Sequence, residues 1–334
     1  MVKTIIVGAG AISYCHAEAL TKLGIKIIGI YDINRESATK LATLYSTFVI
    51  DDFELAVKEA DIVHICTPPS FRIQYAKIAM EAGCHVVMEK PMAITLKDAE
   101  ILNALMKKNN RKLMIDFNHR FRYGFQRLLD IVKSGVIGDV INVYVNRMGM
   151  LGENAGTKKD TWRRNLTTVC GMSIESLSHD IDMIIQLAGP IASVKADIRG
   201  TYEDIPQFDN NVNVCFNLKN GAMGLINASW SSYLKSSSRG IIGTEGSVVL
   251  DGDDLFDFSR LRLRTKDMAH EEIYMLNDIY NFATCPSYYN ANKYFIECIL
   301  NDLNPSTSGE YALSTLKVSH AILESAKSQQ TIQL

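Results

Sequence analysis

The sequence predicts an α/β protein of two domains. We expect a parallel sheet with covering helices in residues 1–121 and an α+β domain with an antiparallel sheet in residues 122–334. The chain has 334 residues, which at about 150 residues per domain suggests two domains. Short β-branched runs alternate with helical patterns in the first domain, whereas consecutive strand patterns dominate from Ile191 onward. These two patterns are typical of βαβ crossovers and of antiparallel sheets, respectively.

The composition excludes several classes of protein. Apolar residues make up 47% and charged residues 22% of the chain, which is typical of a globular protein rather than a disordered chain, a fibre or a coiled coil. Lys and Arg number 35 against 37 Asp and Glu, so the net charge of −2 argues against nucleic-acid and anionic membrane partners. No apolar run approaches the ~18 residues of a membrane span, and residues 1–8 resemble a strand more than a signal peptide.

The first domain is expected to contain six strands joined by helices. The strands are apolar almost throughout, as in a parallel sheet that is covered on both faces. They are predicted at Lys3–Val7, Ile25–Tyr31, Thr47–Ile50, Asp61–Cys66, His85–Met88 and Lys112–Asp116. Helical periodicity between them predicts helices at Ala11–Leu23, Arg35–Tyr45, Phe53–Glu59, Arg72–Ala82 and Leu96–Lys108.

The second domain is expected to place helices on one face of an antiparallel sheet. Apolar residues alternate with polar ones between Asn211 and Leu218, and Asn220-Gly221 then predicts a hairpin turn into a strand at Ala222–Trp230. Further strands are predicted at Asp139–Asn146, Ile241–Thr244 and Ser247–Asp251. The helices are predicted at Tyr123–Ser134, Ser173–Leu187, Tyr289–Asn301 and Gly309–Lys327.

The seven cysteines are odd in number and include no C-x-x-C pair. We interpret them as reduced thiols in the core of a cytoplasmic protein, and we expect no metal site.

A glycine-rich turn follows the first predicted strand. Its sequence is Gly8-Ala9-Gly10-Ala11-Ile12-Ser13, that is G-x-G-x-x-S rather than G-x-G-x-x-G. The first glycine allows a tight turn, and the second lets the backbone approach a pyrophosphate at the helix N-terminus. A small Ser13 is expected to replace the third glycine in packing the helix on the strand. Because the motif opens a helix inside a βαβ unit, it predicts a dinucleotide site rather than a turn without a ligand.

The end of the second strand indicates which dinucleotide is preferred. Asp32 lies 22 residues after Gly10, where an acid accepts hydrogen bonds from the adenosine ribose and repels a 2′-phosphate. This favours NAD over NADP. Arg35 is the counter-evidence, since an arginine just after the strand can pair with a 2′-phosphate, and NADP therefore stays open as the alternative cofactor.

With the later strands included, the chain resembles the glucose–fructose oxidoreductase, inositol dehydrogenase and MocA family (Gfo/Idh/MocA). The matching positions run over the whole chain in the expected order. They are Gly8-x-Gly10, His16-Ala17, Thr67-Pro68, Glu89-Lys90-Pro91, Trp162-Arg163, Cys170-Gly171-Met172, Glu175-x-x-x-His179, Asp182, Gly243-Thr244-Glu245-Gly246 and Ser325-Ala326.

The resemblance implies a doubly wound Rossmann domain, a second domain with a large open, mostly antiparallel sheet, and a homodimer or homotetramer that packs through that sheet. It implies a nicotinamide cofactor, held by the Gly8–Ile12 turn together with Thr67, Pro68, Glu89 and Lys90. The implied reaction is oxidation or reduction of a ring carbon of a sugar, inositol or related polyol. Three positions depart from the family pattern: Ser13, Arg72 where histidine is frequent, and Glu175 where aspartate is frequent.

Lys90 is the candidate acid/base. Removal of hydride from an alcohol carbon requires a base for the hydroxyl proton, and Lys90 follows an apolar strand at the carboxyl end, where ligands of such sheets bind. Partial desolvation and a neighbouring nicotinamide cation both lower the pKa of a lysine. By resemblance, the Lys90–Pro91 bond is expected to be cis. Without the resemblance, a surface lysine at a strand end is the simpler interpretation.

One predicted helix supplies the candidate partners of Lys90. At 100° per residue, four polar side chains fall in one stripe, with apolar side chains opposite. The polar residues are Glu175, His179, Asp182 and Gln186. His179 is expected to contact the substrate hydroxyl and relay its proton, oriented by Glu175. The alternatives are an ordinary solvated helix face and, with less support, a zinc site.

The remaining candidates and rival functions are weaker. Arg163, together with Asp182, is a candidate contact for substrate, although Arg163 also fits an ordinary loop charge. Tyr233 and Tyr289 fit core packing better than a pocket. One rival function is a glycosidase that oxidises and then re-reduces its sugar, and another is a ligand-sensing binding protein without catalysis. Retention of both Lys90 and His179 argues against the second rival.

Overall fold

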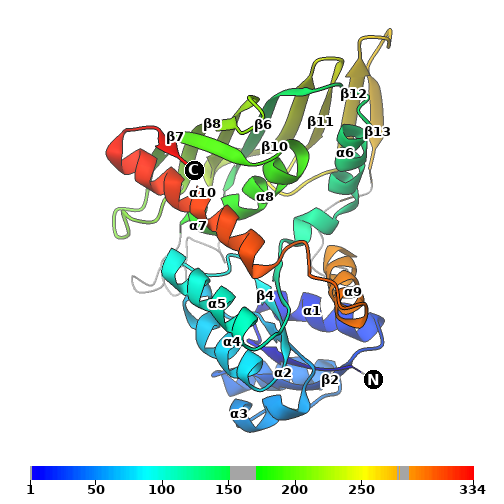
Figure 1. Cartoon of the computed structure of the whole chain (residues 1–334), viewed down its shortest axis with the longest axis vertical. Coiled ribbons are helices and arrows are strands. Elements are labelled where there is room, and N and C mark those ends of the chain that lie inside the picture. The colour runs from blue at the N-terminus through cyan, green and yellow to red at the C-terminus, as the bar shows by residue number, and fades with distance from the viewer. Residues whose placement is uncertain (1, 151–170, 277, 279–285) are drawn as a thin grey trace. The chain divides into compact units, whose positions relative to one another are not determined.

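The computed structural model describes residues 2–150, 171–276, 278 and 286–334. The chain forms two compact units (Figure 1). The first unit comprises Met1–Phe121 and Asn281–Leu316, and the second comprises Arg122–Tyr280 and Lys317–Leu334. The chain therefore leaves the first unit after residue 121 and returns to it for residues 281–316.

The first unit is built on a five-stranded parallel sheet in the order β2-β1-β3-β4-β5. Its strands are β1 (Lys3–Val7), β2 (Lys26–Tyr31), β3 (Ile62–Ile65), β4 (His85–Glu89) and β5 (Leu113–Asp116). The connecting helices are α1 (Ala11–Lys22), α2 (Arg35–Leu44), α3 (Phe53–Ala56), α4 (Arg72–Glu81) and α5 (Leu96–Lys108). Three short 3₁₀ segments lie at Val57–Glu59, Pro69–Phe71 and Asn118–Phe121.

Both faces of this sheet are covered, as the apolar strands predict. The buried side chains of α1 and α2 pack with Ile6 and Ile30 on one face. On the same side, α9 (Pro286–Leu300) packs through Phe295 against Ile62 and Val87. Helices α4 and α5 lie on the other side of the sheet from α1 and α9 (Figure 1). The sixth strand predicted at Thr47–Ile50 is wrong, because this segment contributes only an isolated bridge between Val49 and Ile30.

The second unit is built on a nine-stranded sheet in the order β13-β12-β11-β10-β6-β9-β8-β7-β14. Every neighbouring pair is antiparallel except β6 and β9. The strands are β6 (Val140–Met150), β7 (Ile191–Arg199), β8 (Asn211–Leu218), β9 (Met223–Ser229), β10 (Ser231–Gly243), β11 (Gly246–Gly252), β12 (Arg260–Thr265), β13 (Glu272–Met275) and β14 (Ile332–Gln333). The predicted large, mostly antiparallel sheet is confirmed.

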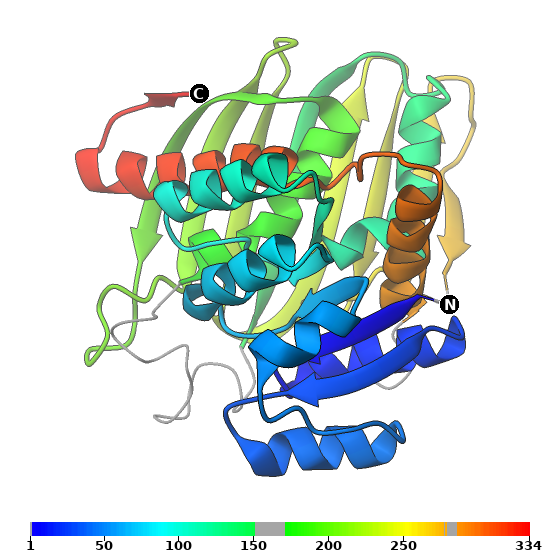
Figure 2. The ribbon, with the colours of Figure 1, turned by 60° about the horizontal axis from the view of Figure 1, so that its bottom comes forward.

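Helices cover one face of this second sheet (Figure 2). They are α6 (Tyr123–Lys133), α7 (Met172–Glu175), α8 (Leu177–Ala188) and the last part of α10 (Gly309–Ser328). Their apolar side chains form one core with the inward residues of the strands, such as Val212, Val214 and Phe216 of β8. The single helix predicted at Ser173–Leu187 is wrong in one respect, because it is divided at Ser176 into α7 and α8.

Other expectations are tested by single residues. Cys66, Cys84, Cys215 and Cys298 are free thiols, whereas Cys15 is disulfide-bonded, so the expectation of reduced thiols is wrong for this residue. Tyr233 has 89% of its surface exposed and does not pack in a core. Among the described helices, none combines the length and the apolar run that are needed to cross a bilayer.

Candidate active site

The glycine-rich turn joins β1 to α1 at the carboxyl end of the sheet. Gly8 has a φ of +98°, a region that favours glycine. A Cβ atom here would lie 3.0 Å from the carbonyl carbon of Cys66 and 3.1 Å from the amide nitrogen of Thr67. The Gly8 amide also donates to the carbonyl of Tyr31, at 2.8 Å. Only glycine therefore fits this crossing of the β1, β2 and β3 ends.

Gly10 fits the predicted role of a close approach to a ligand. It precedes α1 in extended conformation, offers no side-chain cap, and has no atom within 4 Å of the position a Cβ would take. The predicted contacts Ala11 and Ile12 form the first turn of α1 beside this open space, where main-chain amides bind phosphates well. Ser13 is buried and its hydroxyl donates to the Gly8 carbonyl at 2.7 Å. A third glycine at this position would only allow close packing. Ser13 in addition closes the turn with its hydrogen bond to Gly8.

Asp32 follows the last residue of β2, and Arg35 is the first residue of α2, but the partners of the two side chains differ. The Asp32 carboxylate accepts hydrogen bonds from the amide of Ala9, at 2.6 Å, and of Asn34, at 2.7 Å. Asp32, the residue predicted to bind the ribose, is therefore hydrogen-bonded to the glycine-rich turn. Arg35 is exposed and forms an ion pair with Asp51. This pairing weakens the argument from Arg35 in favour of NADP.

The Lys90 turn follows β4 directly, with Glu89 as the last residue of that strand. The Lys90–Pro91 peptide bond is cis, as the resemblance implies. The turn is held by Arg72, the first residue of α4, which is 4% exposed. The Arg72 guanidinium donates through Nη1 to the carbonyls of Glu89 and Pro91, and through Nε to the carbonyl of Thr67, at 2.8 Å.

A chain of buried polar side chains lies beneath this turn. His16 Nε2 is 3.2 Å from Glu89 Oε1 and 3.6 Å from Asp116 Oδ2. On the other side of the ring, Asn292 Nδ2 is 3.2 Å from His16 Nδ1, and it also donates to the Tyr288 carbonyl at 2.8 Å. Asn292 Oδ1 is 2.6 Å from Nε2 of His64. The network joins β3, β4, β5, α1 and α9 within the first unit.

The cluster of His16, Glu89 and Asp116 has the composition of a metal site, and its ligand atoms lie within 4.8 Å of one another. The hydrogen bonds oppose that assignment. The Asn292 amide nitrogen, which donates to the Tyr288 carbonyl, lies at His16 Nδ1, so His16 Nε2 is the ring atom that faces the carboxylates of Glu89 and Asp116. Although burial lowers it, the neighbouring Cys66, Glu89 and Asp116 raise the pKa of His16 well above its usual range, so Nε2 carries a hydrogen toward the carboxylates, where a metal would need a lone pair.

Burial separates the pKa values of groups in this network. Burial raises the pKa of Asp116 to about 8, and the neighbouring Glu89 adds to the rise. Burial lowers the pKa of His64 to about 3, and His16 contributes to the decrease. Asp116 therefore holds its proton at neutral pH, whereas His64 is neutral there.

The second unit contains the other predicted catalytic residues. Glu175 is the last residue of α7, and His179 lies in the first turn of α8, with Asp182 one turn later. All three are buried, so the solvated helix face weighed from sequence does not describe them. Ser176 separates α7 from α8 between Glu175 and His179. Arg163 lies outside the described residues.

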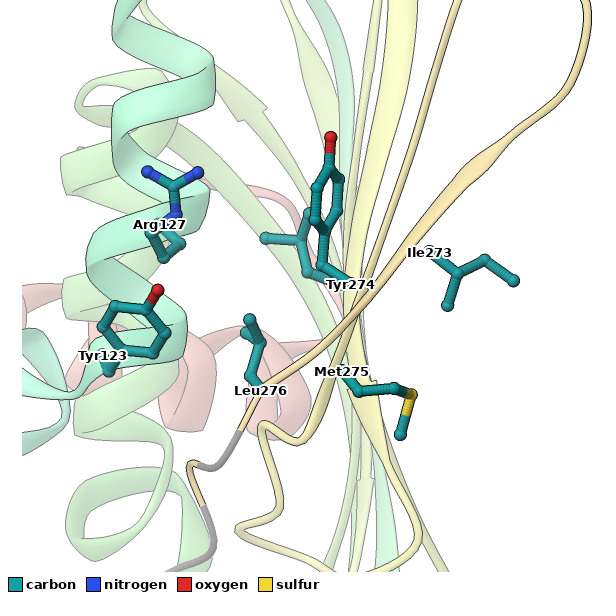
Figure 3. Close-up of a pocket in the computed structure, with 7 residues that line it drawn as sticks. Tyr123, Arg127, Ile273, Tyr274, Met275 and Leu276 are labelled. Carbon is teal, nitrogen blue, oxygen red and sulfur yellow. The ribbon is translucent and has the colours of Figure 1, made fainter.

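A pocket of the second unit lies between α6 and β13 (Figure 3). It is lined by Tyr123, Arg127, Leu261, Ile273, Tyr274, Met275 and Leu276. None of the residues predicted for cofactor binding or catalysis lines it, and we assign it no role in the proposed reaction.

Sequence reasoning missed the roles of Arg72, Asp116 and Asn292. Arg72 was noted only as a departure from the family pattern, yet it contacts both the Thr67 and the Lys90 turns. Asp116 carries a usable signal, since it ends a strand whose neighbours are apolar. Asn292 has none, because it meets His64 from 228 positions away.

Comparisons with known proteins agree with this geometry. Residues 2–117 match the model of the oxidoreductase family with an NAD-binding Rossmann fold, and residues 125–249 match that of the GFO/IDH/MocA C-terminal domain. A D-glucoside 3-dehydrogenase of Escherichia coli is 34% identical over 164 residues, or 46% of each chain, so less than half of that relative is spanned. The D-xylose 1-dehydrogenase [NADP(+)] of Haloarcula marismortui is 24% identical over 279 residues, 82% of this chain and 74% of the relative.

The fold matches solved structures over its whole length. A levoglucosan dehydrogenase in complex with NADH and levoglucosan superposes with a TM-score of 0.88 at 18% identity, covering 100% of this chain and 99% of that one. The two matched models lie on the first and second units in order and together cover most of the chain. The chain therefore belongs to the Gfo/Idh/MocA oxidoreductase family, with an NAD-binding Rossmann domain as its first unit.

Proposed function

We propose that the protein is an NAD(P)-dependent dehydrogenase that transfers a hydride between the cofactor and a ring carbon of a sugar, inositol or related polyol. One observation of the first unit carries the proposal. The glycine-rich turn, the Thr67 turn and the Lys90 turn are tied together at the carboxyl ends of β1, β3 and β4. This end of a parallel sheet is where doubly wound folds bind dinucleotides. The relatives named above act on sugars, which supports the substrate class.

The chain's own residues divide the work of binding. Gly8 and Gly10 leave room for the backbone to approach a pyrophosphate, and the first turn of α1 offers amides to it. Asp32 is the ribose ligand in this proposal and favours NAD, with NADP as the weaker cofactor. Thr67 and Pro68 line the same site from the end of β3. When bound, the nicotinamide supplies the hydride acceptor or donor.

Lys90 is proposed as the acid/base. In the direction of oxidation, its neutral amine takes the proton of the substrate hydroxyl as the carbon loses hydride. In the reverse direction, the ammonium returns that proton. Its position after β4 and the fixed main chain on both sides of it support this role, since a flexible lysine side chain depends on its backbone for direction.

The second unit supplies the substrate contacts in this proposal. His179 contacts the substrate hydroxyl and relays its proton, Glu175 orients His179, and Asp182 and Arg163 bind further polar groups of the substrate. Burial of Glu175, His179 and Asp182 on α7 and α8 supports a role away from bulk solvent. We also propose a homodimer or homotetramer, because the helices of the described residues cover one face of the nine-stranded sheet, and apolar residues such as Met223 and Leu225 are exposed.

A substrate panel tests the proposal directly. NADH formation is measured with inositols, free hexoses and pentoses, glycosides, sugar phosphates and nucleotide sugars, each with NAD and with NADP. We expect stoichiometric reduction of NAD with one class of these compounds. Hydrolysis of a glycoside without net NADH formation would instead establish the glycosidase alternative. Cofactor and sugar binding without reduction or hydrolysis for any class would contradict the proposal and favour a sensor.

A further inference from the structure

We propose that Arg72 is a positioning residue of the reaction. It fixes the orientation of the Lys90 main chain, and hence of its side chain, relative to the glycine-rich turn. The inference rests on the proposed role of Lys90. It goes beyond that role by assigning a residue that is not itself expected to contact the substrate.

The contacts of Arg72 connect two turns that lie far apart in the sequence. Its Nη1 donates to the carbonyls of Glu89 and Pro91, the residues immediately before and after Lys90. Its Nε donates to the carbonyl of Thr67, 2.8 Å away, in the turn that follows β3. Three N–H groups of one planar guanidinium thus hold three main-chain carbonyls in a fixed arrangement.

On its other side, the Thr67 turn packs against the glycine-rich turn. Gly8 approaches the Cys66 carbonyl and the Thr67 amide so closely that a Cβ would contact them at 3.0 to 3.1 Å. A displacement of the Thr67 turn is therefore transmitted to the Gly8 turn through main-chain atoms. Arg72 is consequently the side chain through which the peptide groups flanking Lys90 and the loop that holds the dinucleotide keep one relative position.

The chemistry requires such a link because Lys90 has a long and flexible side chain. Donors to the flanking carbonyls help to hold the backbone from which this side chain extends. Arg72 is buried, so these carbonyls would lose their partner away from solvent if the guanidinium were removed. The turn would then shift to find other donors, and a displacement of about 1 Å near reacting groups can cost about 100-fold in rate.

Arginine suits this position better than lysine. A guanidinium presents its N–H groups in a rigid planar fork, whereas an ammonium is a single centre on a flexible stem. Arg72→Lys keeps the positive charge and most of the volume, but one ammonium cannot reach three separated carbonyls in the same geometry. Arg72→Met keeps the apolar stem and removes every donor. The two variants separate the effect of charge from the effect of the fork.

The test measures kcat, KM and the dissociation constant for NAD in Arg72→Met and Arg72→Lys, with substrate found in the panel. We expect kcat to fall about 10- to 100-fold in Arg72→Met and by a smaller factor in Arg72→Lys. The NAD dissociation constant should change by a smaller factor than kcat, because Arg72 bonds both carbonyls that flank Lys90, whereas it acts on the glycine-rich turn through the Thr67 turn. Thermal unfolding of each variant verifies that the fold persists, and Arg72→Lys carries the test if Arg72→Met does not fold.

A double-mutant cycle separates positioning from general stabilisation. If Arg72 acts through Lys90, Arg72→Met should reduce kcat little further in a Lys90→Met background. Losses that multiply, or a kcat within twofold of wild type in Arg72→Met while Lys90→Met is impaired, would overturn the inference. A near-normal kcat in Lys90→Met alone would instead refute the proposed acid/base, so the two failures are distinguishable.

Discussion

The first unit buries His16, Glu89 and Asp116 together, and the second unit buries Arg147, Arg239 and Asp180 together. In the second cluster, Asp180 lies between the two arginines, with each oxygen 3.1 Å from one guanidinium. Both clusters are excluded from water, so they differ in the chemistry of their side chains and not in their burial. The first combines groups that can exchange protons, whereas the second consists of opposite charges.

Their pKa values follow this division. Burial raises the pKa of Asp116 to about 8, within the range where enzymes work. Burial lowers the pKa of Arg239 only to about 10, partly because Asp180 opposes the decrease, so the guanidinium stays charged at neutral pH. Burial of charged groups alone therefore does not mark a functional site. The first cluster adjoins Lys90 through Glu89 and contains a group that titrates near pH 8, whereas we expect the second to act on stability.

The largest expected effect on stability comes from the second cluster. Asp180→Asn leaves Arg147 and Arg239 buried without their shared counter-charge, and we expect a loss of about 3–5 kcal/mol in the free energy of unfolding. Urea denaturation of the second unit's transition measures it. Lys235→Gln, which breaks the exposed pair with Asp254 in the same unit, is the matched control and should leave the transition unchanged. Equal transitions for the Asp180 variant and the control would show that the buried charges are dispensable.

An effect of comparable size, but with a distinct pH signature, is expected from the first cluster. Asp116 keeps its proton up to about pH 8 in the folded state, but an unfolded aspartate loses it near its ordinary value of 3.8. Its contribution to stability is therefore complete below about pH 4 and is lost as the pH rises through 8. The slope approaches about 1.4 kcal/mol per pH unit between these values.

Asp116→Asn should remove this slope. Unfolding curves recorded from pH 5 to 8 should show the stability of the wild type decreasing relative to that of the variant. Asp180→Asn serves as the comparison, because it should shift the curves by a similar amount at each pH. Parallel curves for the wild type and Asp116→Asn would break the distinction between the two clusters.

The smallest expected effect concerns the choice of cofactor. Asp32→Ser removes the negative charge that opposes a 2′-phosphate, and it should narrow the preference for NAD over NADP about tenfold, equivalent to about 1.4 kcal/mol. Asp51→Asn frees Arg35 from its ion pair and should raise the affinity for NADP alone. Calorimetric titration with both cofactors measures these changes. Tighter binding of NADP by the unmodified protein would show that Arg35 outweighs Asp32.

Local patterns predicted most of the first sheet because each element depends on its own residues. Gly8 and Gly10 predict the turn, and the apolar runs predict the strands of the sheet. Both predictions are confirmed. Thr47–Ile50 has the composition of a strand, yet it forms only one bridge, to Ile30. A strand forms only where the neighbouring strand pairs with it over several residues, and composition does not report this. The break at Ser176 was missed for a similar reason, since apolar periodicity continues through it.

The sequence predicted those residues of the candidate site whose type and position after a strand are enough to indicate their role. Lys90 follows from its position after an apolar strand together with the family resemblance. Arg72 contacts carbonyls 17 and 19 positions away, and carbonyls carry no side-chain signal. The return of residues 281–316 to the first unit, which brings Asn292 against His64, is a tertiary event without a local pattern.

The proposed exchange of the substrate proton by Lys90 can be tested with one substitution. Lys90→Met keeps most of the side-chain length and the main-chain contacts of Arg72, so the fold and the cofactor site should survive. We predict that kcat falls by about 10²–10⁴ or more while the NAD dissociation constant stays within a few-fold. Lys97→Met, on the exposed surface of α5, is the matched control and should keep full activity. A kcat near that of the wild type in Lys90→Met, with NAD binding intact, would contradict the account.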